Sequence, residues 1–131
     1  GAAVAAMADG LTRVVLDLHH QGKLHAVLAA GGSGGSAIAS QAMRALPIGV
    51  PKVLVSTMAG GDVAPYVDSS DLTMMYSVVD ISGINSVSSH ILGNAAAAAA
   101  GMARRQERSY EELAGPRRKV VAATMFGVTT P

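Results

Sequence analysis

Cysteine and tryptophan are absent from this chain of 131 residues, and aromatic residues make up only 3% of it. Without cysteine, disulfide bonds and thiolate chemistry are excluded, a composition compatible with the cytoplasm, where we expect the protein. With so few aromatic rings, the core has to be built from Ala, Val, Ile, Leu and the seven Met. The length is that of one domain with a core of its own.

Long hydrophobic runs and an excess of charge are also missing. No segment reaches the ~18 strongly apolar residues that are typical of a membrane span. The N-terminus lacks the basic segment and Leu-rich block of a signal peptide. Ten basic and nine acidic residues give a net charge of +1. This is not the excess of positive charge that is typical of proteins that bind nucleic acid or an anionic membrane. We therefore expect neither nucleic acid nor membrane as a partner.

Glycine, by contrast, is concentrated in one stretch, Gly31-Gly32-Ser33-Gly34-Gly35-Ser36. An apolar run leads into it and a helical pattern from Ala37 to Leu46 leads out, so the stretch is predicted to connect a strand to a helix. Because glycine costs ordering entropy, it is expected where the backbone turns sharply or a ligand approaches it closely. The N–H groups and dipole of a helix start favour anions. The alternative is a tight turn that binds nothing.

The rest of the chain alternates between helical and strand patterns. An apolar stripe at Val4, Met7, Leu11, Val14 and Leu18 predicts a helix, and another is expected from about Asn85 to Arg108. Strands are predicted at His25–Ala30, Lys52–Thr57 and Val120–Thr124, with a shorter one at Leu72–Tyr76. This order predicts a three-layer, Rossmann-like α/β domain with a mostly parallel sheet.

The first predicted helix has no strand before it, so we expect the sheet to lack one or more N-terminal strands. Residues 1–119 would then be part of a nucleotide-binding α/β domain. Residues 120–131 would form a strand and turn that lead into a following α/β domain absent from this chain.

A second candidate region follows the predicted strand Lys52–Thr57. Met58–Ser70 has no regular pattern, and such long loops beyond a strand's carboxyl end are often functional. Ser56, Thr57 and Asp62 could shape the ribose side of a site or a metal site. Acidic residues of this region could hold Mg²⁺ through water, or could be solvated turn residues: Asp62, Asp68 and Asp71. Asp80–Ser89 could be another anion site or ordinary helix capping.

Known phosphate-binding motifs match the glycine stretch only in part. Gly32, Gly34 and Ala37 fit G-x-G-x-x-A, but no acidic residue ends the next strand to bind a ribose. No lysine follows the glycines, which excludes a Walker A motif. A generic phosphate or carboxylate cradle is left, made of the N–H groups of Gly32–Ser36 and the hydroxyls of Ser33 and Ser36. No histidine has metal-ligand spacing, so no metal site of that kind is expected.

Several ordered segments of the chain resemble the Tm-1-like ATP-binding proteins, also called the UPF0261 family: Gly31–Ser36, Arg44–Lys52, Val55–Ala59, Pro65–Val67, Ser70–Asp71, Ile84–Asn85 and Met125–Pro131. The resemblance covers nearly the whole chain. It implies an internal piece of a longer protein, and nucleotide binding at the glycine turn, since the plant namesake of the family binds ATP. The family pattern also has an upstream turn with a lysine that this chain does not contain, and often Thr at position 36.

The sequence and the resemblance together predict a nucleotide-binding module. ATP, with Mg²⁺ as a candidate companion, would be held by Gly31, Gly32, Ser33, Gly34, Gly35 and Ser36, with Ser56, Thr57 and Asp62 beside it. One alternative is part of an enzyme acting on a small phosphorylated or carboxylated metabolite, with Asp62, Asp80 or His90 as acid or base. Another is a structural piece that assembles through Ala95–Ala100. We expect a homo-oligomer.

Overall fold

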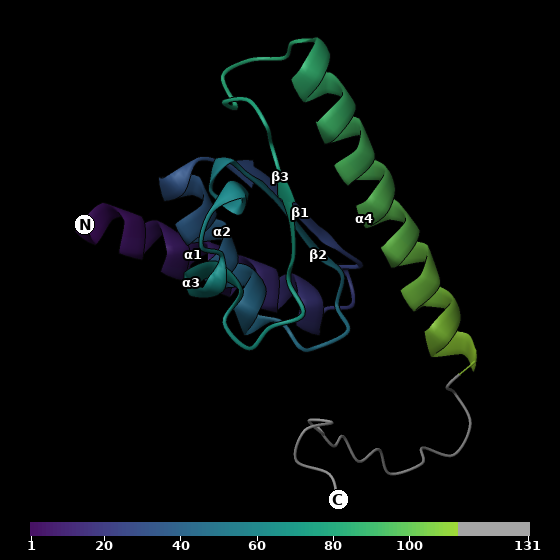
Figure 1. Cartoon of the computed structure of the whole chain (residues 1–131). Coiled ribbons are helices and arrows are strands. Elements are labelled where there is room, and N and C mark those ends of the chain that lie inside the picture. Colours follow the sequence, from purple (N-terminus) through teal and green to yellow (C-terminus); the bar gives the residue numbers. More distant parts are fainter. Residues whose placement is uncertain (113–131) are drawn as a thin grey trace, which may run out of the picture.

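The computed structural model of the protein describes residues 1–112 and has a parallel sheet at its centre (Figure 1). The strands lie in the order β1 (Val27–Gly31), β2 (Lys52–Ser56) and β3 (Thr73–Tyr76). Their register places Gly31, Ser56 and Tyr76 level with one another, at the carboxyl ends of the three strands. The predicted α/β architecture is therefore confirmed as an open, three-stranded parallel sheet flanked by helices.

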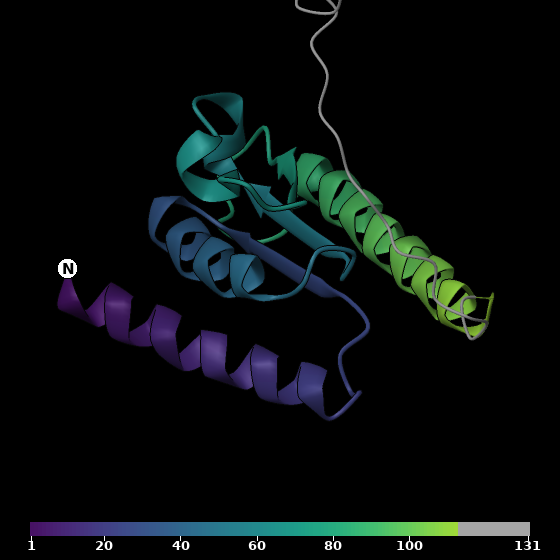
Figure 2. The same cartoon turned by 90° about the horizontal axis from the view of Figure 1, so that it is seen from below.

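Helices cover both faces of this sheet. Figure 2 shows α1 (Ala2–His20) and α2 (Ser33–Ala45) on one side and the long α4 (Ser86–Glu112) on the other. Two short helices, η1 (Thr57–Gly60) and α3 (Ala64–Val67), connect β2 to β3 on the side of α2. In the described part of the chain, none of the helices combines the length and apolar character that crossing a membrane requires.

The core lies above and below β2, whose five residues are all buried. Such a strand reads as a continuous apolar run because helices cover both of its faces. Leu54 packs under α2, together with Ala39 and Met43. On the opposite face, Val53 and Val55 pack against alanines of α4. The small side chains of Ala95 and Ala99 let this helix approach the sheet closely.

Two predicted elements differ from the structure in their details. Helix α2 begins at Ser33 and not at Ala37, so three of the four glycines lie at its cap or in its first turn. The bond from Ser36 N–H to Gly32 O, 2.8 Å, and the one between the hydroxyls of Ser36 and Ser56, 2.6 Å, hold the first turn despite the weak helix propensity of glycine. Helix α1 packs on α2 through Ala8 and Val15, while the predicted stripe from Val4 to Leu18 stays exposed.

The boundaries of other elements agree with the predictions to within a few residues. Met58–Ser70 is not wholly irregular, since η1 and α3 together occupy seven of its positions. Helix α4 continues past Arg108 to Glu112. The predicted strand at Val120–Thr124 and the turn after it lie outside the described residues. The domain boundary at residue 119 and the lack of N-terminal strands stay predictions.

Candidate functional site

The glycine stretch lies where β1 ends and α2 begins, at the carboxyl edge of the sheet. Gly31 is the last residue of β1 and is in close contact with the first turn of α2. A Cβ atom on Gly31 would lie 3.0 Å from Gly35 Cα and 3.2 Å from its carbonyl carbon. Both atoms are backbone and cannot give way easily, so the turn requires glycine at position 31.

The N-terminus of α2 has no side-chain cap. Its N-cap residue is Gly32, and no side chain accepts a hydrogen bond from the N–H groups of the first turn. Ser33, Gly34 and Gly35 are exposed. The first N–H groups of a helix have no partner within the helix, and the positive end of the helix dipole lies at the same place. The predicted anion cradle thus lies at an exposed helix start, where Ser36 N–H already donates to Gly32 O; anion binding there stays a prediction.

Two of the predicted site hydroxyls lie inside the fold. Ser36 is completely buried, with its Oγ 2.6 Å from Ser56 Oγ and 3.3 Å from the carbonyl oxygen of Gly31. Ser56 is buried as well, and its Oγ accepts a hydrogen bond from Met58 N–H at 3.0 Å. These hydroxyls fasten the glycine turn to β2 and η1. Thr57 is closer to the surface, with its Oγ1 3.7 Å from the position of a Cβ on Gly32.

The acidic residues of the connecting segment do not form one site. Asp62 is exposed, and its Oδ1 accepts a hydrogen bond from Ala64 N–H at 3.0 Å, at the start of α3. Asp71 lies before β3, where it pairs with Lys52. Among the described residues, no three Asp, Glu or His side chains gather as ligands of a metal ion. The idea that Asp62, Asp68 and Asp71 together hold Mg²⁺ therefore has no support in the geometry.

The second predicted anion site, Asp80–Ser89, is a capped helix start. Asn85 Oδ1 accepts hydrogen bonds from Val87 N–H and Ser88 N–H, both at 2.9 Å. Ser88 Oγ in turn accepts one from Asn85 N–H at 2.8 Å. This reciprocal pattern is a capping box, which occupies the groups that an anion would need. Of the two alternatives, ordinary capping is the one that the structure supports.

Tyr76 is a residue of this edge that sequence analysis did not single out. It ends β3, level with Ser56, and 47% of it is exposed. A Cβ on Gly60 would lie 3.1 Å from its ring, so η1 covers one side of the ring closely. The sequence did contain a signal for Tyr76: it ends a predicted strand, and the chain has only three tyrosines and one phenylalanine.

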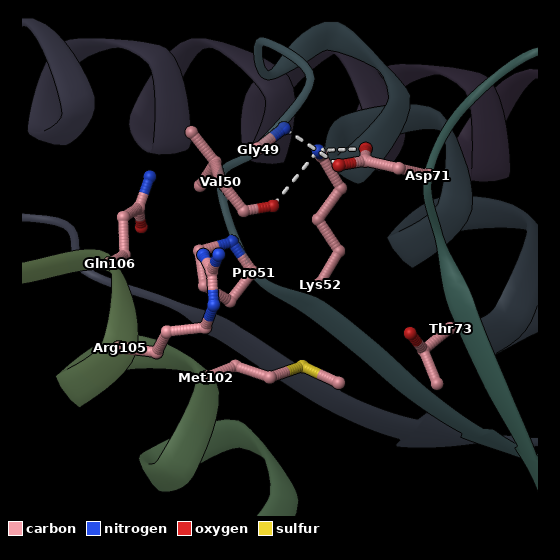
Figure 3. A pocket seen from close by; sticks show the side chains of 9 residues that line it. All are labelled: Gly49, Val50, Pro51, Lys52, Asp71, Thr73, Met102, Arg105 and Gln106. Carbon is pink, nitrogen blue, oxygen red and sulfur yellow. Dashed lines mark hydrogen bonds and ion pairs between the residues drawn. The ribbon is translucent and has the colours of Figure 1, made fainter. Parts of the chain in front are cut away.

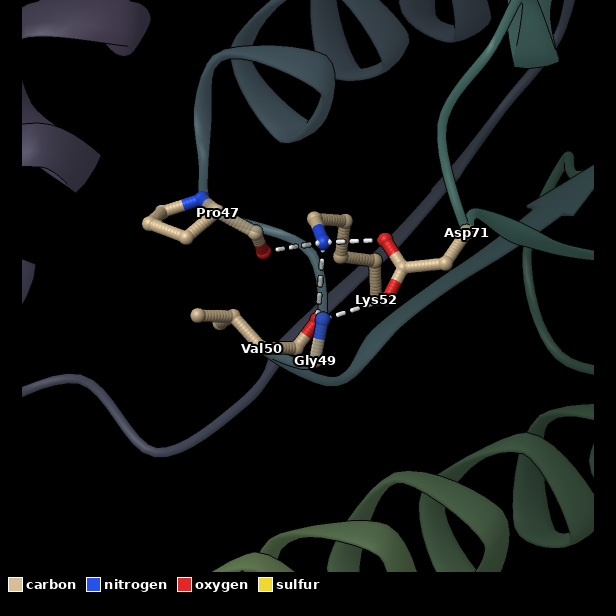
Figure 4. Close-up of polar contacts among 5 residues, drawn as sticks. All are labelled: Pro47, Gly49, Val50, Lys52 and Asp71. Atoms are coloured by element: carbon tan, nitrogen blue, oxygen red, sulfur yellow. Dashed lines mark hydrogen bonds and ion pairs between the residues drawn. The ribbon is translucent and has the colours of Figure 1, made fainter. Parts of the chain in front are cut away.

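At the opposite, amino edge of the sheet an ion pair between the buried Lys52 and the partly exposed Asp71 lines a cavity of about 190 Å³ (Figure 3). Lys52 Nζ lies 2.6 Å from Asp71 Oδ1 and also donates to the carbonyl oxygens of Pro47 and Val50 (Figure 4). Asp71 Oδ2 accepts a hydrogen bond from Gly49 N–H at 2.7 Å. Each polar group is satisfied within the fold, which indicates a structural role.

The same contacts set the charge of Asp71. Burial works to raise the pKa of this carboxyl group, but the hydrogen bonds from Lys52 and Gly49 and the charge of Lys52 outweigh burial, so the pKa lies below its ordinary value. Lys52 is level with Val27, the first residue of β1, whereas the glycine turn begins at Gly31, the last residue of β1. Lys52 is thus at the wrong end of the sheet to contact a ligand at the turn.

These features define a class: a parallel α/β unit with a glycine-rich, uncapped helix start at the carboxyl edge of its sheet. Residues 1–108 match the family described as "Uncharacterised protein family (UPF0261) N-terminal domain", and the chain belongs to this family. The resemblance seen in the sequence is thereby confirmed.

Three relatives illustrate the range of the family. A UPF0261 protein of Clostridium tetani is 51% identical over 130 residues, which are 99% of this chain and 31% of that protein. One of Rhizobium meliloti is 48% identical over the whole chain and 31% of its own length. The ToMV resistance protein Tm-1(GCR237) of Solanum lycopersicum is 46% identical over 100% of the chain and 18% of its own length. The chain thus spans about a third of the length of these two bacterial relatives.

Proposed function

We propose that this chain is a nucleotide-binding module that takes ATP, with the phosphates on the glycine turn. The observation that carries the proposal is the uncapped start of α2: Gly32 supplies no capping side chain, and Ser33, Gly34 and Gly35 are exposed. The start of α4 supports it by contrast, because Asn85 and Ser88 cap that helix. A helix start that leaves its N–H groups to solvent at the ligand edge of a parallel sheet suits a phosphate.

Each residue of the turn has its own part in this proposal. The N–H groups of Ser33, Gly34 and Gly35 would bind phosphate oxygens, with the hydroxyls of Ser33 and Thr57 beside them. Ser36 and Ser56 would act indirectly, because their hydroxyls bind each other and hold the turn in place. Gly31 would allow α2 to start close to β1.

Tyr76 and Asp62 extend the same edge. The half-exposed ring of Tyr76 offers a flat apolar surface for a base, since aromatic rings stack on nucleobases. Asp62 is exposed near the turn of η1 into α3, where its second oxygen could face a ribose or, through water, Mg²⁺. The proposal places the protein in the cytoplasm, where ATP is made and used. The expected homo-oligomer stays a prediction.

Calorimetric titration of ATP, with and without Mg²⁺, tests the proposal. The matched variants are Gly34→Val and Gly10→Val, since a Cβ at either glycine meets nothing within 4 Å. Both glycines are exposed and helical, but only Gly34 lies at the start of α2. We expect Gly10→Val to bind like the wild type, and Gly34→Val to bind at least about tenfold more weakly, a loss of about 1.4 kcal/mol.

Circular dichroism of both variants would check that they are folded. Equal ATP affinity in Gly34→Val and in the wild type would contradict the proposal. Binding of inorganic phosphate or a small phosphorylated acid in place of ATP, also lost in Gly34→Val, would instead favour the alternative of a metabolite-binding part of an enzyme.

A further inference from the structure

A buried hydroxyl without a hydrogen-bond partner lies at the carboxyl end of β3. Ser77 directly follows this strand, and only 3% of it is exposed. Among residues 1–112, Ser77 Oγ is the one buried side-chain oxygen or nitrogen that forms no hydrogen bond. An unpaired buried hydroxyl lowers the stability of a protein, and such groups are rare in folded structures. The stability of the fold therefore does not account for a serine at position 77.

The backbone directly after Ser77 is strained. Val78 has a φ angle of 63°, in the left-handed region, and Val79 N–H donates to Ser77 O at 2.7 Å. This is the rare form of the three-residue turn, and a β-branched residue is poorly suited to it. Val78 is 59% exposed, so burial of its side chain does not hold the turn in place. Backbone strain of this kind is concentrated at sites that bind ligands or change conformation.

Ser77 lies where the chain leaves two neighbouring strands toward opposite faces of the sheet. Its N–H donates to Ser56 O at 3.2 Å and continues the ladder between β2 and β3. After β2 the chain turns into η1 and α3 on the side of α2, whereas after β3 it leads to α4 on the other side (Figure 2). Open α/β sheets bind ligands at the carboxyl ends of strands whose connections diverge in this way. The unpaired hydroxyl and the strained turn thus share a position that suits a ligand.

We propose that Ser77 Oγ binds the nucleoside end of the nucleotide, and that the turn at Val78 relaxes when it does. This inference rests on the proposed binding of phosphates at the glycine turn. Gly31 and Tyr76 end β1 and β3, and these strands lie two spacings apart, about 10 Å at ~4.8 Å per spacing. A single phosphate group is too small to contact both strand ends. A nucleoside triphosphate is longer, because its sugar and base extend well beyond the phosphates.

Tyr76 and Ser77 offer the nucleoside two different kinds of contact. Successive residues of a strand point to opposite faces, so the two side chains flank the end of β3 from its two sides. The ring of Tyr76 lies on the side of η1, close to Gly60, and provides an apolar surface. A serine hydroxyl both donates and accepts hydrogen bonds, so Ser77 can bind a polar group of the sugar or the base.

The strained turn provides a way for the buried hydroxyl to reach a ligand. Rotation of the backbone at Val78 out of the left-handed region would break the bond from Val79 N–H to Ser77 O and uncover Ser77. The exposed side chain of Val78 can move without opening the core. Since the strain is present only before this rotation, its release favours the bound state.

Calorimetric titration of the full chain with ATP and with inorganic triphosphate separates the nucleoside end from the phosphates. We expect Ser77→Ala to bind ATP about fivefold more weakly, the loss of one hydrogen bond, and to bind triphosphate like the wild type. The matched control is Ser40→Ala. Ser40 is 2% exposed, but its Oγ already donates to Ala37 O at 3.3 Å, so this variant should bind both ligands like the wild type.

Thermal denaturation of the same variants gives a readout that moves in the opposite direction. Ser77→Ala removes an unpaired buried hydroxyl, so its Tm should rise by about 4 °C although its ATP affinity falls. A serine that only supports the fold would lower both. Val78→Gly should also raise the Tm and should weaken ATP binding about fivefold, because glycine removes the strain whose release favours the bound state.

The outcomes distinguish this inference from the proposed function. ATP binding that is lost in Gly34→Val but unchanged in Ser77→Ala would overturn the role of Ser77 and leave the phosphate site standing. Equal losses of ATP and triphosphate binding in Ser77→Ala, or a lowered Tm, would also overturn it, since the hydroxyl would then support the fold. Unchanged ATP affinity in Val78→Gly would overturn the relaxing turn. No binding of ATP by the unaltered chain would overturn both the inference and the proposed function.

Discussion

The hydroxyl oxygens of Ser36 and Ser56 lie 2.6 Å apart, although 20 positions separate the residues in the chain. Ser36 belongs to the start of α2 and Ser56 ends β2. Ser56 Oγ also accepts the hydrogen bond from Met58 N–H that starts η1. One pair of buried hydroxyls thus fixes the glycine turn, the neighbouring strand and the next helical turn relative to one another.

Replacing these serines should affect stability unequally. Ser36→Ala removes one hydroxyl of the pair, and we expect it to lower the free energy of unfolding by about 1 kcal/mol. Ser56→Ala also leaves Met58 N–H without its partner, so its cost should be larger, about 2 kcal/mol. Urea denaturation measures both. Ser33→Ala, at an exposed position of the same turn, should stay within about 0.5 kcal/mol of the wild type. Equal effects of Ser56→Ala and Ser33→Ala would contradict the assignment.

Two glycines of the turn should respond in opposite directions to the same substitution. In Gly31→Ala the new methyl group would lie 3.0 Å from Gly35 Cα. We expect a loss of about 1–3 kcal/mol from this overpacking against backbone. In Gly34→Ala the methyl group meets nothing within 4 Å, and Gly34 lies in α2. This variant should gain about 0.5–1 kcal/mol, because alanine loses less entropy in a helix. Thermal denaturation of the two variants and the wild type shows directly whether each substitution raises or lowers the stability.

Removing the carboxylate of Asp71 should destabilise the protein in a pH-dependent way. In Asp71→Asn the buried ammonium of Lys52 loses its counter-charge. A fully buried pair would cost about 3–5 kcal/mol to break; the side chain of Asp71 is 36% exposed, so we expect about 2 kcal/mol at pH 7.

The sign of the pH effect follows from the pKa of Asp71, which is lowered in the folded state. A group of this kind stabilises the fold fully above its unfolded pKa and loses that contribution as the pH falls through the folded pKa. The difference between wild type and Asp71→Asn should therefore shrink below about pH 4. Asp17→Asn, an exposed position on α1, is the control and should change stability by less than about 0.5 kcal/mol at pH 7. A difference that is constant down to pH 2 would be incompatible with the ion pair.

Val78 should be more stable as glycine. Its φ angle is 63°, in the left-handed region, and Val79 N–H donates to Ser77 O at 2.7 Å across it. This tight turn is strained for a β-branched residue. Since Val78 is 59% exposed and little packing is lost, Val78→Gly should raise the free energy of unfolding by about 1 kcal/mol. Val87→Gly, in the first turn of α4, should lower it by a similar amount. A destabilised Val78→Gly would show that the strain is absent.

Local patterns in the sequence were sufficient for the order and type of the main elements. The continuous apolar run of β2, the glycine stretch and the alanine-rich α4 are each recognisable from near neighbours alone, because strand and helix patterns depend on residues a few positions apart. The same patterns placed Gly31, Gly32, Ser33, Gly34 and Gly35 between a strand and a helix. They misplaced the start of α2, since glycine has poor helix propensity and the buried bond between the hydroxyls of Ser36 and Ser56, which helps to hold the first turn, joins residues far apart in the chain.

The sequence by itself determined the α/β class and the location of the glycine turn. The tertiary structure decided which groups of that turn stay available. The hydroxyls of Ser36 and Ser56 bind each other inside the fold, and Lys52 forms an ion pair with Asp71 at the opposite edge. On α1 the predicted stripe is exposed, while Ala8 and Val15 are buried. The physical reason is that hydrogen-bond partners and burial depend on residues distant in the chain, 19 and 20 positions away for these two pairs, which no local pattern reports.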